Sequence, residues 1–261
     1  MKKYFSIFKY SLKVNFAFVF DYFFSTISFA VHMMVFGFLW DYILRDGTLY
    51  GYSKTELIWY IVMAEFITYG VTSFYKNISE MVKDGTIANM LVRPINMMVY
   101  FLCEQSANIM KIVINLIAAL IIGNVMTMGD AGGGVEITLA SIGFFALSSA
   151  LSFIIAAFLQ LVIGFIAFFM EEVKAIWLIV QKVQLLIVFI PIEFYDTWVQ
   201  KLLWLSPTTH MIYAPGRIFV KYNMAEAINL IGLQIVAVVA TAIVAMLLYR
   251  KGVEKINVNG G

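Results

Sequence analysis

Six apolar runs, each long enough to cross a lipid bilayer, constrain the fold of this chain more than any other feature. They cover residues 22–42, 57–75, 97–123, 137–170, 175–192 and 227–249. A helix of about 20 apolar residues spans the hydrocarbon core of a bilayer. Only 13% of the 261 residues are charged, about half the share found in an ordinary soluble domain. We therefore expect an all-α polytopic membrane protein with six transmembrane helices in a single domain.

Two local signals bear on where these helices begin and end. Ser53 and Glu56 have the spacing of a capping box, which predicts a helix start just before the second run. The run at 137–170 would reach roughly 50 Å as one upright helix. We expect it to tilt, to break near Gly164, or to continue beyond the bilayer.

Residues 1–20 have an amphipathic pattern. Polar residues recur at helical spacing and face an apolar stripe, the first set being Lys2, Ser6, Lys9 and Lys13 and the second Phe5, Phe8, Leu12, Phe16 and Val19. We expect an interfacial helix whose lysines face anionic head groups while its phenylalanines enter the acyl boundary. The simpler alternative is a flank whose charges only set the orientation of the first span.

The segment at 193–222 is too interrupted to be a span. Prolines bracket or interrupt it, and it carries aromatic residues of the kind that favour the membrane–water interface. These residues are Pro191, Pro207 and Pro215, with Tyr195, Trp198, Trp204 and Tyr213. We expect broken helices that dip into the outer leaflet before the sixth span.

The Lys and Arg residues outside the runs predict the orientation. With a cytoplasmic amino terminus, the inner segments hold eleven of them, namely Lys2, Lys3, Lys9, Lys13, Lys76, Lys83, Arg93, Lys174, Arg250, Lys251 and Lys255. The outer segments then hold five, namely Arg45, Lys54, Lys201, Arg217 and Lys221. Cytoplasmic loops carry an excess of positive residues, so we expect both termini to be cytoplasmic.

A charged segment joins the second and third runs and cannot lie in lipid. Residues 80–94 read Glu-Met-Val-Lys-Asp-Gly-Thr-Ile-Ala-Asn-Met-Leu-Val-Arg-Pro. Charges and unpaired backbone groups in hydrocarbon cost several kcal/mol each. We expect a cytoplasmic docking element within residues 76–96, and the alternative is a solvated loop with a helix stop.

The residue types of this segment fit a short, rigid knob. Gly85 can end one helix in the left-handed conformation, and Pro94 limits the next helix. Between them lies an expected outward apolar ridge, flanked by charges available for ionic contacts. The ridge is Ile87, Met90 and Leu91, and the charges are Glu80, Lys83, Asp84 and Arg93.

Polar groups also occur inside the runs. The third run places four of them on one helical face, namely Glu104, Asn108, Lys111 and Asn115. Ionisable groups at the bilayer centre cost at least about 2.5–3.5 kcal/mol each, so they normally face a partner or a watery path. Glu65 in the second run lies at a depth similar to that of Lys111, and we expect these two residues to form an ion pair.

His32 in the first run and Lys182 in the fifth complete the set of titratable groups that we consider. Two interpretations of the whole set stay open. Its members can line a substrate route between subunits. They can also form helix-to-helix hydrogen bonds, each worth roughly 0.6 to 2 kcal/mol in membranes.

The chain has no recognisable catalytic or metal-binding motif. His32 and His210 lie in different segments, and neither an HExxH nor a Gly-x-Ser-x-Gly motif is present. The single cysteine, Cys103, excludes an intrachain disulfide and a multi-cysteine metal site. The glycines at 132–134 lack the Gly-Lys-Ser/Thr of a nucleotide loop. We expect no cofactor or metal in this chain and no nucleic-acid partner.

Taken in order, these features resemble the ABC transporter permeases of the type-2, or ABC-2, export class. The likeness rests on the Gly-x-Ile-Ala-x-x-Leu-x-Arg-Pro sequence at residues 85–94. It also rests on the sequences at 205–207 and 213–216, Leu-Ser-Pro and Tyr-Ala-Pro-Gly, and on the interfacial helix that precedes six spans. The resemblance covers nearly the entire chain.

The resemblance implies a membrane subunit of an ATP-driven exporter in the cell membrane. In this family the cytoplasmic loop after the second span meets a separate ATP-binding-cassette ATPase, which would bind ATP and Mg. A second permease chain, identical or related, would complete the route. We expect an amphipathic or hydrophobic substrate, such as a drug, a peptide or a lipid-like molecule.

Two other classes of function remain as alternatives. An ion-coupled secondary transporter would use Glu65, Lys111 or His32 to carry a proton. A membrane-embedded enzyme acting on lipid would require a catalytic cluster, which we do not find in the sequence.

Overall fold

The computed structural model describes residues 2–17, 19–44, 48–93, 95–128, 135–170 and 172–259. Its helices are α1 (Lys2–Ala17), α2 (Val19–Ile43), α3 (Lys54–Gly70), α4 (Tyr75–Lys83), α5 (Ile87–Leu91), α6 (Met97–Ser106), α7 (Ile109–Thr127), α8 (Leu139–Ile166), α9 (Lys174–Phe189), the 3-10 helix η1 (Ile192–Phe194), α10 (Thr197–Trp204), α11 (Pro207–Val220) and α12 (Met224–Asn259). No strand occurs within the described ranges. The all-α prediction is confirmed.

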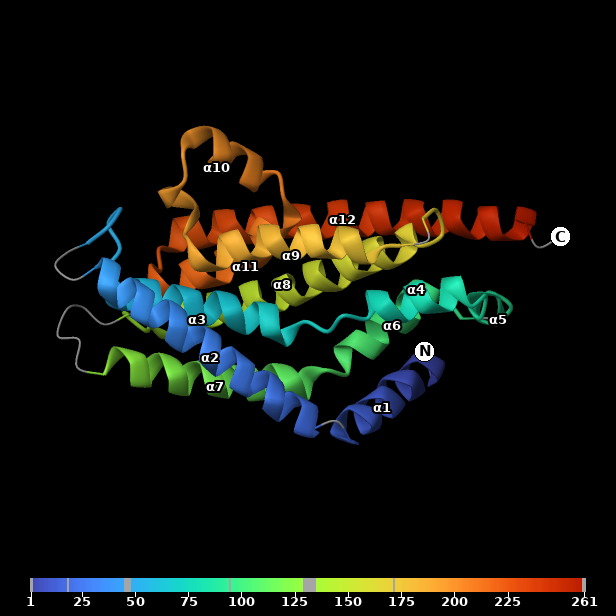
Figure 1. The fold of residues 1–261 in the computed structure, drawn as a ribbon, viewed down its shortest axis with the longest axis horizontal. Helices are drawn as coiled ribbons and strands as arrows, with labels where there is room; N and C mark the ends of the chain where they lie inside the picture. Colours follow the sequence, from blue (N-terminus) through green and yellow to red (C-terminus); the bar gives the residue numbers. More distant parts are fainter. Residues whose placement is uncertain are drawn as a thin grey trace.

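The long helices run roughly along the long axis of the molecule (Figure 1). One end, which we call the α5 end, holds α4, α5, the start of α1 and the last turns of α12. The opposite end, which we call the far end, holds the last turns of α2 and α7 and the first turns of α3 and α8. The start of α1 and the last turns of α12 thus lie toward the same end of the molecule.

Five stretches in the described part of the chain are helical, long and apolar enough to cross a membrane. They are Tyr22–Ile43, Lys54–Lys83, Met97–Thr127, Leu139–Ile166 and Met224–Lys255. The fifth predicted span corresponds to α9, which has 16 residues. Such a helix is about 24 Å long, against a hydrocarbon core of roughly 30 Å. α9 does run back from the α5 end toward the far end (Figure 1), but the count of six spans stays a prediction.

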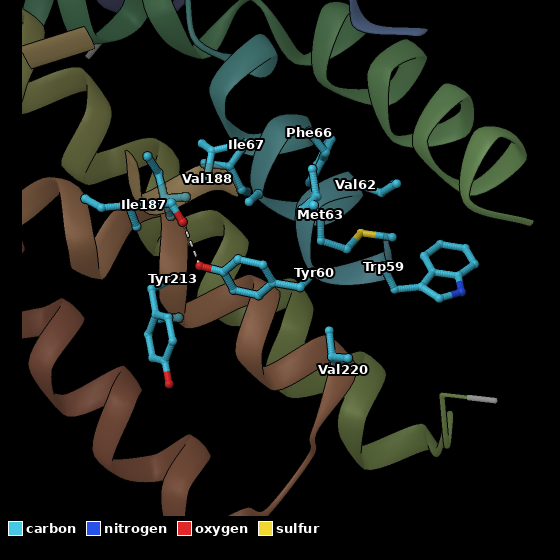
Figure 2. Packing of buried hydrophobic residues seen from close by; sticks show 14 of the residues in the cluster. Trp59, Tyr60, Val62, Met63, Phe66, Ile67, Ile187, Val188, Tyr213 and Val220 are labelled. Carbon is cyan, nitrogen blue, oxygen red and sulfur yellow. Dashed lines mark hydrogen bonds between the residues drawn. The ribbon is translucent and has the colours of Figure 1, made fainter. Parts of the chain in front are cut away.

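The core is built around α3 and α11. Tyr60 of α3 points toward α9, where its hydroxyl donates a hydrogen bond of 2.8 Å to the carbonyl oxygen of Ile187 (Figure 2). α11 begins at Pro207 and is buried along most of its length. Pro215 stands inside this helix, so it does not interrupt the chain as we expected. The breaks before α12 fall around η1 and α10 instead.

The second and third predicted spans are each broken, which we did not predict. Residues 71–74 separate α3 from α4, and residues 107–108 separate α6 from α7. The two breaks are joined by side chains, since the Thr72 hydroxyl donates to Gln105 Oε1 and Asn108 Nδ2 donates to Thr72 Oγ1 at 3.3 Å. A helix can be interrupted inside a bundle when neighbouring side chains supply such partners.

The expected helix boundaries are partly confirmed. The capping box at the start of α3 is present, with Ser53 Oγ accepting from the Glu56 amide and Glu56 Oε2 accepting from the Ser53 amide. α8 passes Gly164 without a break and ends at Ile166. A Cβ at Gly164 would lie 2.7 Å from Cδ1 of Ile78. The glycine therefore permits a close approach of α4 to α8.

The amino-terminal helix forms as predicted. α1 lies beside α6, and the Tyr4 hydroxyl accepts a hydrogen bond of 3.0 Å from the Asn96 amide. None of its residues is buried, and both Phe5 and Phe16 are exposed. This apolar surface suits a lipid boundary, and the interfacial position of α1 stays a prediction.

Candidate functional site

The segment between the second and third spans folds into two short helices, α4 and α5, joined by a tight turn. Gly85 in this turn has φ of +75°, which confirms the expected left-handed conformation. Oδ1 of Asp84 accepts hydrogen bonds from the Thr86 hydroxyl at 2.6 Å and from the Thr86 amide at 3.0 Å. These bonds favour the carboxylate and lower the pKa of Asp84 below its ordinary value. The turn is thus held at neutral pH by an ionised side chain.

The expectation that the apolar ridge faces outward is wrong. Ile87 is only 1% exposed and belongs to a buried cluster with Ile78 and Phe101. Met90 and Leu91 are partly buried against the same cluster. Helix α5 has five residues, so it gains stability by laying its apolar side on α4 and α6. The ridge therefore anchors the segment to the bundle.

The opposite side of this segment is polar and open. We define the polar face of α4 and α5 as Glu80, Lys83, Asp84, Thr86, Asn89, Val92 and Arg93, all of which are exposed. Val92 is 82% exposed, and it is an apolar residue of this face that the sequence analysis did not single out. Lys83 Nζ lies 3.3 Å from Oε2 of Glu172, which ties the face to the turn before α9. Pro94 lies outside the described residues.

The predicted intramembrane groups meet at a cavity of about 440 Å³ between α2, α3, α7 and α9. Its lining residues with a charged, imidazole or amide side chain are His32, Glu65, Lys111, Gln181, Lys182 and Gln184. Nδ1 of His32 lies 2.7 Å from the hydroxyl of Tyr69, which also lines the cavity. The structure thus brings together four of the seven predicted groups, those at 32, 65, 111 and 182.

The expected ion pair between Glu65 and Lys111 is not formed. Lys111 Nζ instead donates a hydrogen bond of 3.0 Å to the carbonyl oxygen of Val71. That carbonyl oxygen lies in the break between α3 and α4, where it accepts from the Lys111 side chain. Glu65 is 3% exposed and lines the cavity, and within the described chain it has neither a salt bridge nor a hydrogen-bond donor.

The single polar stripe that we expected on the third span is divided. Glu104 and Asn108 line a second cavity of about 290 Å³ near the start of α2. Asn115 is 1% exposed and accepts a hydrogen bond of 3.3 Å from the Thr26 hydroxyl. The break between α6 and α7 turns the helix axis (Figure 1), so one helical face cannot continue across it. Asn115 therefore fits the interpretation of a helix-to-helix hydrogen bond.

A network at the far end was missed by the sequence analysis. The Arg217 guanidinium binds both carboxylate oxygens of Glu226, at 2.7 and 3.2 Å, and donates to the Tyr52 hydroxyl at 2.8 Å. Glu193 Oε1 accepts from the hydroxyls of Tyr52 and Tyr213 at 3.1 and 2.6 Å. Burial, and next the Glu193 charge, raise the pKa of Tyr52. This network fixes α11 to α12 and to the turn before α3.

The sequence signal for this network was weak. Arg217 and Glu193 lie in the segment 193–222, which we assigned to an irregular outer region, and Glu226 follows it. Tyr52, which binds Arg217, is 165 residues away in the chain. The sequence offered only one indication of this network, the charged residues Arg217 near Pro215 and Glu226 just before the last span. Their pairing depends on the path of α11, which the sequence did not reveal.

Comparisons with known proteins agree with this architecture. The model of a family described as "ABC-2 family transporter protein" matches residues 29–260, which include the breaks, the cavity and the segment of α4 and α5. A comparison with curated proteins finds no match. Because the family model covers most of the sequence, the chain belongs to the ABC-2 transporter family and is a membrane-spanning permease of that type.

Proposed function

We propose that this chain is the permease subunit of an ATP-driven exporter, and that a separate ATPase subunit docks on the polar face of α4 and α5. The observation that carries the proposal is that this segment has one apolar side and one charged side. Its apolar side is fixed to the bundle, while its charged side is open at the α5 end. A segment of this kind suits a contact with another protein that must move the bundle.

The segment can pass a displacement to the spans through close packing. Ile87 and Ile78 share one buried cluster, and Ile78 lies against Gly164 of α8. The breaks at 71–74 and 107–108 are the places where the long helices can change direction. ATP-driven closure of the ATPase would shift the conformational equilibrium through its different contacts with the two states.

ATP and Mg belong to the partner in this proposal. The chain has no Gly-x-x-x-x-Gly-Lys-Ser/Thr sequence, so hydrolysis falls to the ATPase subunit. A second permease chain, identical or related, would complete the translocation route. The start of α1 and the last turns of α12 lie at the α5 end (Figure 1). The excess of lysine and arginine residues assigned to that end favours a position on the cytoplasmic side of the cell membrane. The substrate would be an amphipathic or hydrophobic molecule moved out of the cytoplasm.

The test is purification of the tagged chain from its own membranes with an assay for ATP hydrolysis. We expect wild type to retain an ATPase, and the double variant Val92→Glu, Arg93→Glu to lose most of it. Both side chains are exposed, so the substitutions leave the fold intact, as gel filtration will verify. Lys201→Glu on the exposed part of α10 is the matched control and should retain the ATPase.

Two results would contradict the proposal. One is an undiminished ATPase in preparations of the well-folded double variant. The other is substrate transport by the purified chain alone, in liposomes that have an ion gradient and no ATPase. The second result would favour the ion-coupled alternative.

A further inference from the structure

The cavity between α2, α3, α7 and α9 contains ionisable side chains that have no oppositely charged partner among the described residues. Glu65 is 3% exposed and lines the cavity, and no described donor reaches its carboxylate. Lys111 uses its ammonium on one backbone carbonyl, that of Val71, although an ammonium has three donors. Lys182 lines the opening from α9 without a salt bridge to any described residue. A carboxylate buried without a partner, such as that of Glu65, is costly to keep ionised, so an oppositely charged occupant would stabilise its ionised form.

The signs of these charges limit the occupant. A purely anionic ligand would face the Glu65 carboxylate, and a purely cationic ligand would face two ammonium groups, those of Lys111 and Lys182. A ligand with one group of each sign can pair with all three residues. The cavity volume, about 440 Å³, falls in the range of roughly 300–1,000 Å³ typical of small-molecule sites.

The surroundings of the cavity supply an apolar surface. Leu185 lines the cavity and is exposed, as is Leu186 beside it on α9. On α2, Val31 and Val35 flank His32 and are also exposed. A polar cavity with an exposed apolar margin fits a molecule that has a charged head and a hydrocarbon tail.

We propose that this cavity binds the head group of a zwitterionic amphiphile, with the ammonium of the ligand on Glu65 and its anionic group on Lys111 and Lys182. This assignment rests on the proposed function, because it names the substrate class of that permease. The same head-group chemistry has two sources, a zwitterionic phospholipid of the bilayer and a separate amphiphile taken up as substrate.

Lys111 would connect ligand binding to the break at residues 71–74. An anionic group on a spare donor of its ammonium would share Lys111 with the carbonyl oxygen of Val71, which is in the break between α3 and α4. Occupancy of the cavity would thus place the ligand next to a contact that holds the break. The break leads directly into α4, so four residues of backbone, 71–74, join the cavity wall at α3 to the helix that begins the segment of α4 and α5.

The test is equilibrium binding of radiolabelled octylphosphocholine to the full chain in phosphatidylglycerol nanodiscs, with empty nanodiscs as background. We expect unlabelled octylphosphocholine to compete at least about ten-fold better than octyltrimethylammonium or octyl phosphate, since a charge-assisted hydrogen bond is worth about that factor or more. Glu65→Gln and Lys182→Gln should each weaken binding about ten-fold. Glu136→Gln and Lys201→Gln remove exposed charges outside the cavity and should leave binding unchanged.

Equal competition by the three head-group classes, or unchanged binding in both cavity variants, would overturn the proposal. If Glu65→Gln does not fold, the proposal is tested by Lys182→Gln alone, because Lys182 is exposed at the opening of the cavity. Unchanged binding in that variant would then overturn it. Nanodiscs that contain phosphatidylethanolamine separate the two sources. Suppressed binding there identifies bilayer lipid as the ligand, and retained binding identifies a separate amphiphile. The assay contains no ATPase, so its failure is distinct from a failure of the ATPase co-purification.

Discussion

At the scale of single residues, the contact between Gly164 and Ile78 decides how closely α4 can lie to α8. A Cβ built at Gly164 would be 2.7 Å from Cδ1 and 2.9 Å from Cβ of Ile78. The Cβ atom of isoleucine cannot rotate away, because its position is fixed by the backbone. Any side chain at 164 must therefore push the two helices apart.

We expect Gly164→Ala to destabilise the protein by about 1–3 kcal/mol, the usual cost of overpacking a core. Gly143→Ala is the matched control, because it lies in the same helix with nothing within 4 Å of its added Cβ. Helix propensity alone favours alanine by about 0.5–1 kcal/mol, so the control should be neutral or stabilised. Unfolding in detergent measures both. Equal behaviour of the two variants would contradict the packing account.

Single residues also show what can be predicted from the sequence. The left-handed conformation of Gly85 was predictable, because glycine adopts it far more readily than other residues and a helix was expected to end there. The burial of Ile87 was not, since an apolar ridge on a short helix can face either a partner or the bundle. Only the presence of Ile78 and Phe101 beside it settles the direction.

At the scale of elements, the start of α4 depends on a side chain from another helix. The Tyr75 amide is in the first turn of α4, where amides lack a helical acceptor. It donates instead to Oε1 of Gln160 on α8, at 3.2 Å in a buried environment. This bond fixes the segment of α4 and α5 relative to the spans.

Gln160→Leu should leave the Tyr75 amide buried without a partner, at a cost of about 1–3 kcal/mol. We expect faster hydrogen exchange across α4, while α12 is unchanged. Gln200→Leu removes an amide from α10, where Gln200 Nε2 donates to the Tyr195 carbonyl, and should not affect α4. Unchanged exchange at α4 in the Gln160→Leu variant would show that the bond does not hold the helix start.

The helix breaks explain most of what the sequence could not predict at this scale. Residues 107–108, Ala and Asn, contain neither proline nor glycine, the usual causes of a kink. The break depends on Thr72 and Gln105, which supply hydrogen-bond partners from neighbouring segments. Partners that meet only in the folded bundle cannot be read from the apolar pattern, and the divided stripe of Glu104 to Asn115 follows from the same cause.

At the scale of the whole molecule, the order of features was predictable because a bilayer imposes strong rules on length and charge. The amino-terminal helix, the apolar helices, the polar segment after the second span and the broken region before the last span all appear in sequence order. The number of crossings depends on α9, whose 16 residues include Lys182 and two glutamines, Gln181 and Gln184, that line the cavity. A short, polar helix of this kind is consistent with a route-lining position.

The central claim is that an ATPase contacts the polar face of α4 and α5. The most direct test places the photo-crosslinker benzoylphenylalanine at Asn89, an exposed residue of α5, in the chain as it occurs in its own membranes. The control position is Trp198, an exposed residue of α10. The account predicts a crosslink from position 89, and none from position 198, to a protein that carries an ATP-binding motif. No crosslink from position 89, or an equal yield from both positions, would contradict it.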